Sequence, residues 1–260
     1  VVRPVLAPID IEDMFGMTVE AFNIAEQYQT PVILLSDQEL SQRKEAVARI
    51  DATRFTVVDR RAPTEHELED YVRFRITESG ISPISRPGMK GGNYLASGIE
   101  HTERGAPTAN GEIHARMNEK RVRKFAPLKD RSDLHVVDGH PDAPIGLVSW
   151  GSLAGVALEA MRLAEAEGLR VKVLVPKLLY PVAEHFYQDF FASVTRGLVI
   201  EQSHQGQLYR LIRMFVDVPR GVEPFSRSGS NPITPQDVLE RIRKQMLAIQ
   251  DDYSPVQQLG

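Results

Sequence analysis

The sequence predicts an α/β protein built on an open, mostly parallel sheet, and three observations support this prediction. Residues 145–176 have the pattern of a buried strand, an amphipathic helix and a second strand. Residues 1–40 repeat that pattern, and strands and helices continue to alternate from 178 to 250. A strand–helix–strand unit with a short return predicts a right-handed crossover between parallel strands. We therefore expect two α/β regions, separated by residues 41–140.

In the first region, the apolar run 1–7 predicts a strand, and Asp10 or Asp13 is expected to cap the helix that follows. Acidic residues in the first turn of that helix are explained by the helix dipole, which favours negative charge there. Residues 32–35 form the second predicted strand, which ends at residues 36–38. This region therefore has the architecture of the 145–176 unit.

The middle region has weaker periodicity and many glycine and proline residues. A long loop inside a compact domain is uncommon and is usually functional when it is ordered. The basic residues of 116–124 are expected to form a solvated helix face or a subunit contact. The elements predicted here are helices at 42–50 and 114–129, strands at 55–58 and 134–137, and a boundary at 138–142.

From residue 145 the pattern is regular again. Gly168 is expected to end the helix of the 145–176 unit, in the left-handed conformation that glycine adopts readily. Thr234 and Pro235 are the residue types of a helix cap and a first helical position. The other predicted elements are helices at 182–193, 205–215 and 235–250, strands at 197–201 and 221–225, and a surface arm at 251–260.

The composition excludes several classes of protein. With 42% hydrophobic and 25% charged residues among 260, the chain has the balance of a soluble globular protein, and its net charge of −4 gives no reason to expect nucleic-acid binding. It has no cysteine, so it cannot by itself hold an iron–sulfur cluster, a thiolate zinc site or a disulfide. No apolar run approaches the ~20 residues of a membrane span, and no signal peptide is recognisable. We expect a cytoplasmic protein and, because the first residue is valine, a segment of something longer.

Ligands of open parallel sheets bind beyond the carboxyl ends of the strands. Gly151 and Ser152 follow one predicted strand and precede a helix, whose free amides would suit an anion. Glu201 and Gln205 follow another strand, and residues 36–38 end the strand of the first region. The alternative is that these residues only pack, since no nucleotide fingerprint and no nucleophile elbow is present. The seven histidines lack the spacing of a metal site, so we predict no metal ligands.

The loop at 81–92 is the strongest pointer to a binding function. Its prolines restrict the backbone, and its glycines allow another group to approach the backbone closely. Arg86 and Lys90 offer cationic donors for a carboxylate or a phosphate. The alternative is a loop that packs over a partner subunit.

Three groups of stretches in the sequence form a pattern: 21–26 with 31–38; 80–83 with 86–88, 98–101 and Gly105; and 149–152 with Tyr180-Pro181 and 201–207. Together they resemble the alpha subunit of 2-oxoacid:ferredoxin oxidoreductases, the 2-oxoglutarate type most closely. The usual arginine directly after the Ser-Pro pair is replaced here by Arg86, further along the loop.

The resemblance implies an enzyme that uses thiamine diphosphate to decarboxylate a 2-oxoacid oxidatively. The acyl group passes to coenzyme A, and electrons pass through an iron–sulfur cluster to ferredoxin. The cluster and the diphosphate and Mg²⁺ site are expected on a beta subunit, within a dimer of heterodimers. Neither nucleic acid nor a membrane is an expected partner.

For this chain the resemblance implies three parts: the C-terminal part of a pyrimidine-binding domain (1–62), a Gly/Pro-rich connecting loop and helix segment (63–140), and a transketolase C-terminal-like α/β domain (141–260). The glutamate that activates the cofactor is expected before residue 1. We therefore assign no catalytic residue and expect the chain alone to be inactive.

The resemblance also assigns the candidate site residues. Ser82, Arg86, Gly91 and Gly92 are expected to line the approach of the substrate or of coenzyme A. A second set, Gly151, Ser152, Glu201 and Gln205, is expected to shape the strand-end surface rather than to touch reacting atoms. Two alternatives remain open: a member specific for pyruvate or indolepyruvate, and a non-catalytic docking and assembly module.

Overall fold

The computed structural model describes residues 2–253, with side chains described as far as residue 250. Two compact units are present, each made of separate stretches of the chain. The first unit contains Thr18–Ile33 and Asp51–Asp130 together with the first few residues. The second unit contains Val5–Met17, Leu34–Ile50 and the chain from Arg131 onward.

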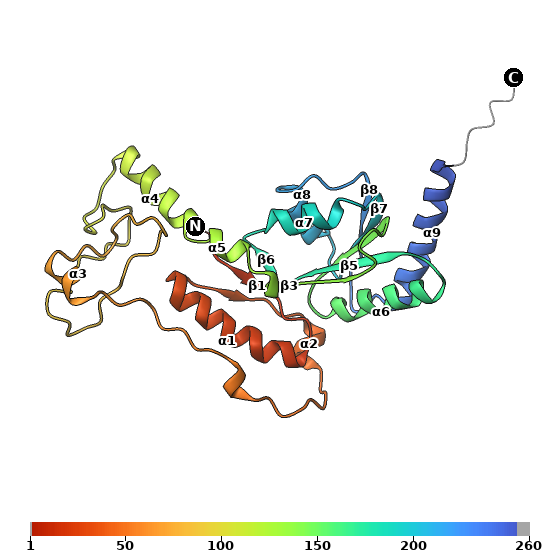
Figure 1. Ribbon diagram of the computed structural model, residues 1–260, viewed down its shortest axis with the longest axis horizontal. Helices are drawn as coiled ribbons and strands as arrows, with labels where there is room; N and C mark the ends of the chain where they lie inside the picture. The colour runs from red at the N-terminus through yellow and green to blue at the C-terminus, as the bar shows by residue number, and fades with distance from the viewer. Residues whose placement is uncertain (1, 254–260) are drawn as a thin grey trace, which may run out of the picture. The chain divides into compact units, whose positions relative to one another are not determined.

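The second unit is organised around a five-stranded sheet with the order β3-β5-β4-β7-β8 (Figure 1). The three pairs β4–β5, β4–β7 and β7–β8 are parallel, whereas the edge strand β3 is antiparallel to β5. The predicted mostly parallel α/β sheet is therefore confirmed, with one antiparallel edge. The strands are β3 (His135–Gly139), β4 (Ile145–Ser149), β5 (Val171–Pro176), β7 (Arg196–Glu201) and β8 (Gly221–Ser226).

Helices cover both faces of this sheet. Successive side chains of a strand point to opposite faces, and accordingly Leu147 of β4 packs in the cluster that contains α6 and α9 residues, whereas Val148 packs in the cluster that contains α7 and α8 residues. Figure 1 shows α6 and α9 on one side and α7 and α8 on the other. The helices are α6 (Leu153–Ala166), α7 (Glu184–Phe191), α8 (Gln207–Arg213) and α9 (Pro235–Tyr253).

The predicted ends of two helices in this unit are confirmed. Gly168, just past α6, has φ +78°, which only glycine adopts at little cost. The hydroxyl of Thr234 accepts the amide of Asp237 at 3.1 Å, so Thr234 caps α9 and Pro235 is its first residue. The predicted arm at 251–260 is helical up to Tyr253, and its remainder lies outside the described residues.

A smaller sheet has the order β2-β1-β6, formed by β1 (Val5–Leu6), β2 (Ile33–Leu34) and β6 (Leu178–Tyr180). Between β1 and β2 runs α1 (Ile11–Tyr28). Asp10 accepts the amide of Asp13 at 2.7 Å, and Asp13 accepts the amide of Ile9 at 3.1 Å. The predicted capping of this helix by Asp10 or Asp13 is therefore confirmed, with both residues taking part.

Two predicted elements before residue 60 are wrong. The helix expected at 42–50 is replaced by α2 (Gln38–Gln42), because Asp37 caps that helix early and Arg43 already has extended backbone. No strand forms at 55–58; instead, the amide side chain of Asn23 donates to the carbonyl of Thr56 and accepts the amide of Val58. A short 3-10 helix, Ala52–Arg54, precedes this segment.

The stretch 63–130 folds within the first unit, so the description of 63–140 as a Gly/Pro-rich connecting segment is not confirmed. It contains α3 (Glu65–Glu69), α4 (Gly111–Arg123) and α5 (Ala126–Lys129). The single helix predicted at 114–129 therefore begins earlier, where Asn110 caps it, and is interrupted at Lys124 and Phe125. Phe125 stacks on Tyr28, with ring centroids 5.7 Å apart, in the core of this unit.

A short 3-10 helix, Ser132–Leu134, then leads into β3, and the predicted strand at 134–137 is present as β3. The predicted boundary at 138–142 therefore falls between two strands of one sheet. None of the helices described is long and apolar enough to cross a membrane.

Candidate functional site

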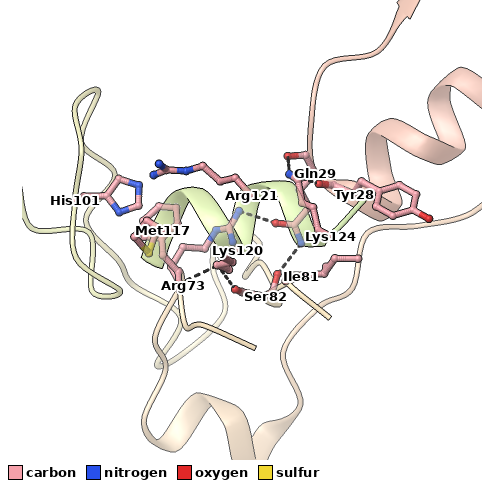
Figure 2. A pocket seen from close by; sticks show the side chains of 12 residues that line it. Tyr28, Gln29, Arg73, Ile81, Ser82, His101, Met117, Lys120, Arg121 and Lys124 are labelled. Atoms are coloured by element: carbon pink, nitrogen blue, oxygen red, sulfur yellow. Dashed lines mark hydrogen bonds between the residues drawn. The ribbon is translucent and has the colours of Figure 1, made fainter. Parts of the chain in front are cut away.

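The first unit contains a cavity of about 170 Å³, which we call the cationic pocket (Figure 2). Its wall is built from the end of α1, the loop that contains Ser82, and one face of α4. The residues that line it are Tyr28, Gln29, Arg73, Phe74, Gly80, Ile81, Ser82, His101, Met117, Lys120, Arg121 and Lys124.

Four cationic side chains line the pocket, and no acidic residue of the described chain lies on its wall. Lys120 is 7% exposed; its Nζ donates to the hydroxyl of Ser82 at 2.6 Å and to the carbonyl of Phe74 at 3.0 Å. Lys124 Nζ donates to the carbonyl of Tyr28 at 2.7 Å. Within the described side chains neither lysine forms a salt bridge, although buried charges in proteins are usually paired.

The two lysines have strongly lowered pKa values. Burial, helped by the nearby charges of Arg73 and Lys124, lowers the pKa of Lys120 to about 8, although Glu103 partly opposes this shift. Burial, with Arg73 and Arg121, lowers the pKa of Lys124 to about 8 as well. Both groups are therefore charged at neutral pH but held in an environment that opposes their charge.

The two arginines are fixed by polar partners. Arg121 makes a bidentate contact with Glu100, both distances being 2.8 Å, and this hydrogen bonding lowers the pKa of Glu100 to about 2. Arg73 donates to the side-chain oxygen of Gln29 at 2.7 Å. Gln29 in turn donates to the carbonyl of Ser82 at 2.7 Å, which connects the end of α1 to the predicted loop.

Of the loop residues predicted to face a ligand, Ser82 alone belongs to the wall of the pocket. Ser82 is 2% exposed, and its hydroxyl also donates to the carbonyl of Arg75 at 2.7 Å. Arg86 is exposed and lies outside the pocket wall. A Cβ on Gly91 would lie 2.8 Å from the carbonyl oxygen of Leu68, and one on Gly92 would lie 2.7 Å from the Cβ of Ser85, so packing within this unit already requires both glycines.

The strand-end residues of the second unit are held by contacts within the chain. The amide of Ser152 donates to Asp37 at 2.7 Å, and Gly151 has φ +62°, with the position of a Cβ 2.6 Å from the same carboxylate oxygen. Of the two interpretations left open for this turn, the contact at Ser152 favours packing, because the carboxylate of Asp37 occupies the place that an external anion would take.

The other two strand-end residues, Glu201 and Gln205, differ in their exposure to solvent. Glu201 is 2% exposed; its carboxylate accepts the amide of Leu208 in α8 at 2.9 Å, and burial raises its pKa. Gln205 is exposed and accepts from Arg210 at 3.3 Å. Glu201 thus has a clear structural task at the start of α8.

The lysines of the cationic pocket were missed at the level of sequence, where 116–124 was expected to be solvated or to contact a subunit. Met117, Lys120 and Lys124 follow the spacing i, i+3, i+7, which places them on one face of a helix. Since Met117 is buried, the two lysines are carried inward with it. The detectable signal was two lysines on the apolar face of α4.

The residues present do not fit an iron–sulfur cluster or a metal ion. The chain has no cysteine, and the described residues contain no group of three or more His, Asp or Glu side chains that could hold a metal. The cationic pocket offers hydrogen-bond donors and positive charge, which fit an anionic group.

Comparison with known proteins identifies the class to which this fold and site belong. A profile described as "pyruvate flavodoxin/ferredoxin oxidoreductase, thiamine diP-bdg" matches residues 2–120, which include the whole cationic pocket apart from Arg121 and Lys124. The alpha subunit of 2-oxoacid:ferredoxin oxidoreductase 2 from Aeropyrum pernix is 33% identical over 82% of this chain and 34% of its own length.

Two further similarities bear on the substrate. Ketoisovalerate oxidoreductase subunit VorB from Methanothermobacter thermautotrophicus is 31% identical over 92% of this chain and 59% of its own length. A solved structure of 2-oxoglutarate:ferredoxin oxidoreductase from Magnetococcus marinus, with 2-oxoglutarate, coenzyme A and succinyl-CoA bound, has a TM-score of 0.89 and 36% identity, covering 94% of this chain and 42% of that one.

The resemblance predicted from the sequence is confirmed: the chain is homologous to the alpha subunits of 2-oxoacid:ferredoxin oxidoreductases. It spans only part of each of these relatives, between 34% and 59% of the two curated subunits described above.

Proposed function

We propose that this chain is part of the alpha subunit of a 2-oxoacid:ferredoxin oxidoreductase whose substrate is 2-oxoglutarate. With a beta subunit, the enzyme converts the 2-oxoacid and coenzyme A to acyl-CoA, CO₂ and reduced ferredoxin. The observation that carries this proposal is the match over 94% of the chain, at a TM-score of 0.89 and 36% identity, to an enzyme named for 2-oxoglutarate.

In the proposed complex the beta subunit carries the iron–sulfur cluster and the Mg²⁺ and diphosphate site. This is compatible with a chain that has no cysteine and whose described residues contain no metal-ligand group. Thiamine diphosphate, when bound, supplies the chemistry of decarboxylation, while the protein supplies binding and orientation. The chain alone is inactive, and the working assembly is a cytoplasmic dimer of heterodimers that reduces ferredoxin.

Within the chain, residues 1–62 belong to the pyrimidine-binding domain and 141–260 form a transketolase C-terminal-like domain. Residues 63–130, which fold in the first unit, lie between them in the sequence. The loop that contains Ser82, Arg86, Gly91 and Gly92 faces the approach of the 2-oxoacid or of coenzyme A. Its support is the exposed guanidinium of Arg86 and the place of Ser82 on the wall of a cationic pocket.

A second substrate is favoured by a specific observation. A ketoisovalerate oxidoreductase subunit is 31% identical over 92% of the chain, so similarity over this part of the subunit does not separate branched from dicarboxylic 2-oxoacids. Pyruvate and indolepyruvate are the other candidates within the family.

The test is a substrate panel with the native complex, purified anaerobically through this chain. Initial rates of viologen reduction are measured with 2-oxoglutarate, 2-oxoisovalerate, pyruvate and indolepyruvate in the presence of coenzyme A. The proposal expects the highest kcat/KM for 2-oxoglutarate, by about tenfold or more. A higher kcat/KM for another 2-oxoacid would transfer the assignment to that substrate.

A further inference from the structure

The cationic pocket contains more positive charge than its own residues balance. Lys120 on α4 and Lys124 at the C-cap of that helix lie one helical turn apart, and Arg73 faces them from the loop before Ser82. Figure 2 shows these three cations gathered around Ser82 and Gln29. Arg121 is the exception, since its guanidinium is held by the carboxylate of Glu100. The described hydrogen bonds of the other three cations go to neutral oxygen atoms alone. Arg73 also lies over the rings of Phe74 and Tyr94, and Lys124 over that of Phe125, but none of these partners carries a negative charge.

We propose that the cationic pocket is a binding site for an oxyanion, a carboxylate or a phosphate group, which Arg73, Lys120 and Lys124 hold. The identity of the molecule that carries the oxyanion rests on the function proposed above, whereas the anion site itself rests on the geometry of this chain.

The donors needed for such a site are present. An ammonium group has three N–H donors and a guanidinium has five. The contacts described for Lys120 use two of its donors, on Phe74 and Ser82, and those for Lys124 use two on the carbonyls of Tyr28 and Gln29. Arg73 uses one on Gln29. Each cation therefore keeps at least one N–H donor beyond these contacts.

The size of the pocket restricts what enters it. A volume of about 170 Å³ is below the 300 Å³ or more of pockets that enclose whole drug-sized ligands. The cavity thus fits one anionic group or a small organic acid, and a larger molecule would place only its charged end there.

The pH dependence of binding follows from the groups that face the lysines. Arg73, Arg121 and Lys124 oppose the charge of Lys120, while Glu103 favours it; Arg73 and Arg121 oppose that of Lys124. An oxyanion reverses this balance and favours the protonated lysines. Affinity for the anion therefore falls as the pH rises above about 8, where unliganded lysines lose their protons.

The test is calorimetric titration of the full 260-residue chain with three probes: inorganic phosphate, 2-oxoglutarate and coenzyme A. Lys120→Met and Arg73→Gln are the site variants, and circular dichroism verifies that each is folded. Arg162→Gln, which removes an exposed cation of α6 outside the pocket wall, is the matched control. We expect saturable binding of at least one of these anions to the wild-type chain. The affinity should fall about tenfold or more in each folded site variant and stay unchanged in the control.

The three probes distinguish the sources of the oxyanion. Binding of 2-oxoglutarate without phosphate supports a carboxylate site, and binding of phosphate and coenzyme A without 2-oxoglutarate supports a phosphate site. No saturable binding of any probe by the folded chain would overturn the proposal, as would binding that neither folded site variant weakens. If anion binding fails while the complex reduces viologen, this inference alone is lost; if the anion binds but no 2-oxoacid is turned over, the proposed function is lost and the anion site remains.

Discussion

Lys120 is a buried lysine whose ammonium group meets a hydroxyl and a carbonyl but no carboxylate among the described side chains. Its pKa of about 8 lies well below the ordinary value of a lysine side chain, so the folded chain binds this proton less tightly than an unfolded chain does. Between the pKa of Lys120 in the folded chain and its higher pKa in the unfolded chain, the folded chain has already released this proton and the unfolded chain has not. The free energy of unfolding therefore rises with pH over that range. Holding this charge therefore destabilises the first unit at neutral pH.

Replacing Lys120 by Met tests that statement. Between about pH 8 and about pH 10 the wild-type chain should gain free energy of unfolding that Lys120→Met does not gain, because the variant has no proton to release there. The measurement is urea unfolding of both chains at the two pH values. An equal change in both chains would show that Lys120 is not held with a lowered pKa.

The second prediction at the scale of a residue concerns the effect of Arg86 on the KM values of the substrates. Its guanidinium is exposed on the loop proposed to face the substrates, so Arg86→Ala should raise KM for the 2-oxoacid or for coenzyme A by about three- to tenfold, with a smaller effect on kcat. Steady-state viologen reduction by the assembled enzyme gives both constants. Arg162→Ala, on the exposed surface of α6, serves as the control. Unchanged constants in Arg86→Ala would remove this residue from the substrate approach.

At the scale of an element, two glycines allow the backbones of β4 and β7 to pack closely against their surroundings. Gly146 pairs with Gly197 in the parallel register, and a Cβ on Gly197 would lie 2.0 Å from the carbonyl oxygen of Gly146. Phe190 and Val194 close the space over Gly146 on the α7 side. The centre of the five-stranded sheet therefore depends on the absence of side chains at these positions.

Replacing glycine by alanine should change the free energy of unfolding in opposite directions at position 197 and at position 155. Gly197→Ala should lower the free energy of unfolding by about 3 kcal/mol, because the backbone must move to admit the methyl group. Gly155→Ala, at an exposed position of α6 with nothing within 4 Å, should raise it by about 0.5 kcal/mol. Chemical denaturation of the two variants beside the wild type measures both. A tolerated alanine at 197 would contradict the described packing.

The elements that were predicted from sequence and those that were not differ in what stabilises them. Strand β4 is apolar up to Ser149, β5 is apolar apart from Lys172, and α6 has an apolar stripe, so the hydrophobic pattern is sufficient to locate these elements. The segment 55–58 depends instead on hydrogen bonds from the distant side chain of Asn23, which no local pattern reveals.

The candidate site shows the same division. The loop was located because glycine and proline mark it, and Ser82 is indeed on the pocket wall. For Lys120 and Lys124 the sequence predicts a solvated helix face or a subunit contact, because lysine is usually exposed. The burial of Lys120 and the partial burial of Lys124 follow from packing against segments distant in the sequence, including Phe74 and Tyr28, whose carbonyls accept their hydrogen bonds.

At the scale of the whole molecule, the chain is homologous to one part of a larger enzyme subunit. Its second unit is an ordinary α/β sheet, a fold that many unrelated functions share. The unusual chemistry is concentrated in the first unit, in a pocket lined by four cations and by no acid among the described residues. The chain has no cysteine, and its described residues contain no group of three or more His, Asp or Glu side chains that could hold a metal.

The most direct test of this account compares viologen reduction by the isolated chain with reduction by the native complex purified anaerobically through it. Each is supplied with thiamine diphosphate, Mg²⁺ and 2-oxoglutarate, with and without coenzyme A. The account predicts coenzyme-A-dependent reduction by the complex only, with a cysteine-containing subunit that co-purifies. Reduction by the isolated chain, or a complex that neither contains such a subunit nor reduces viologen, would contradict it.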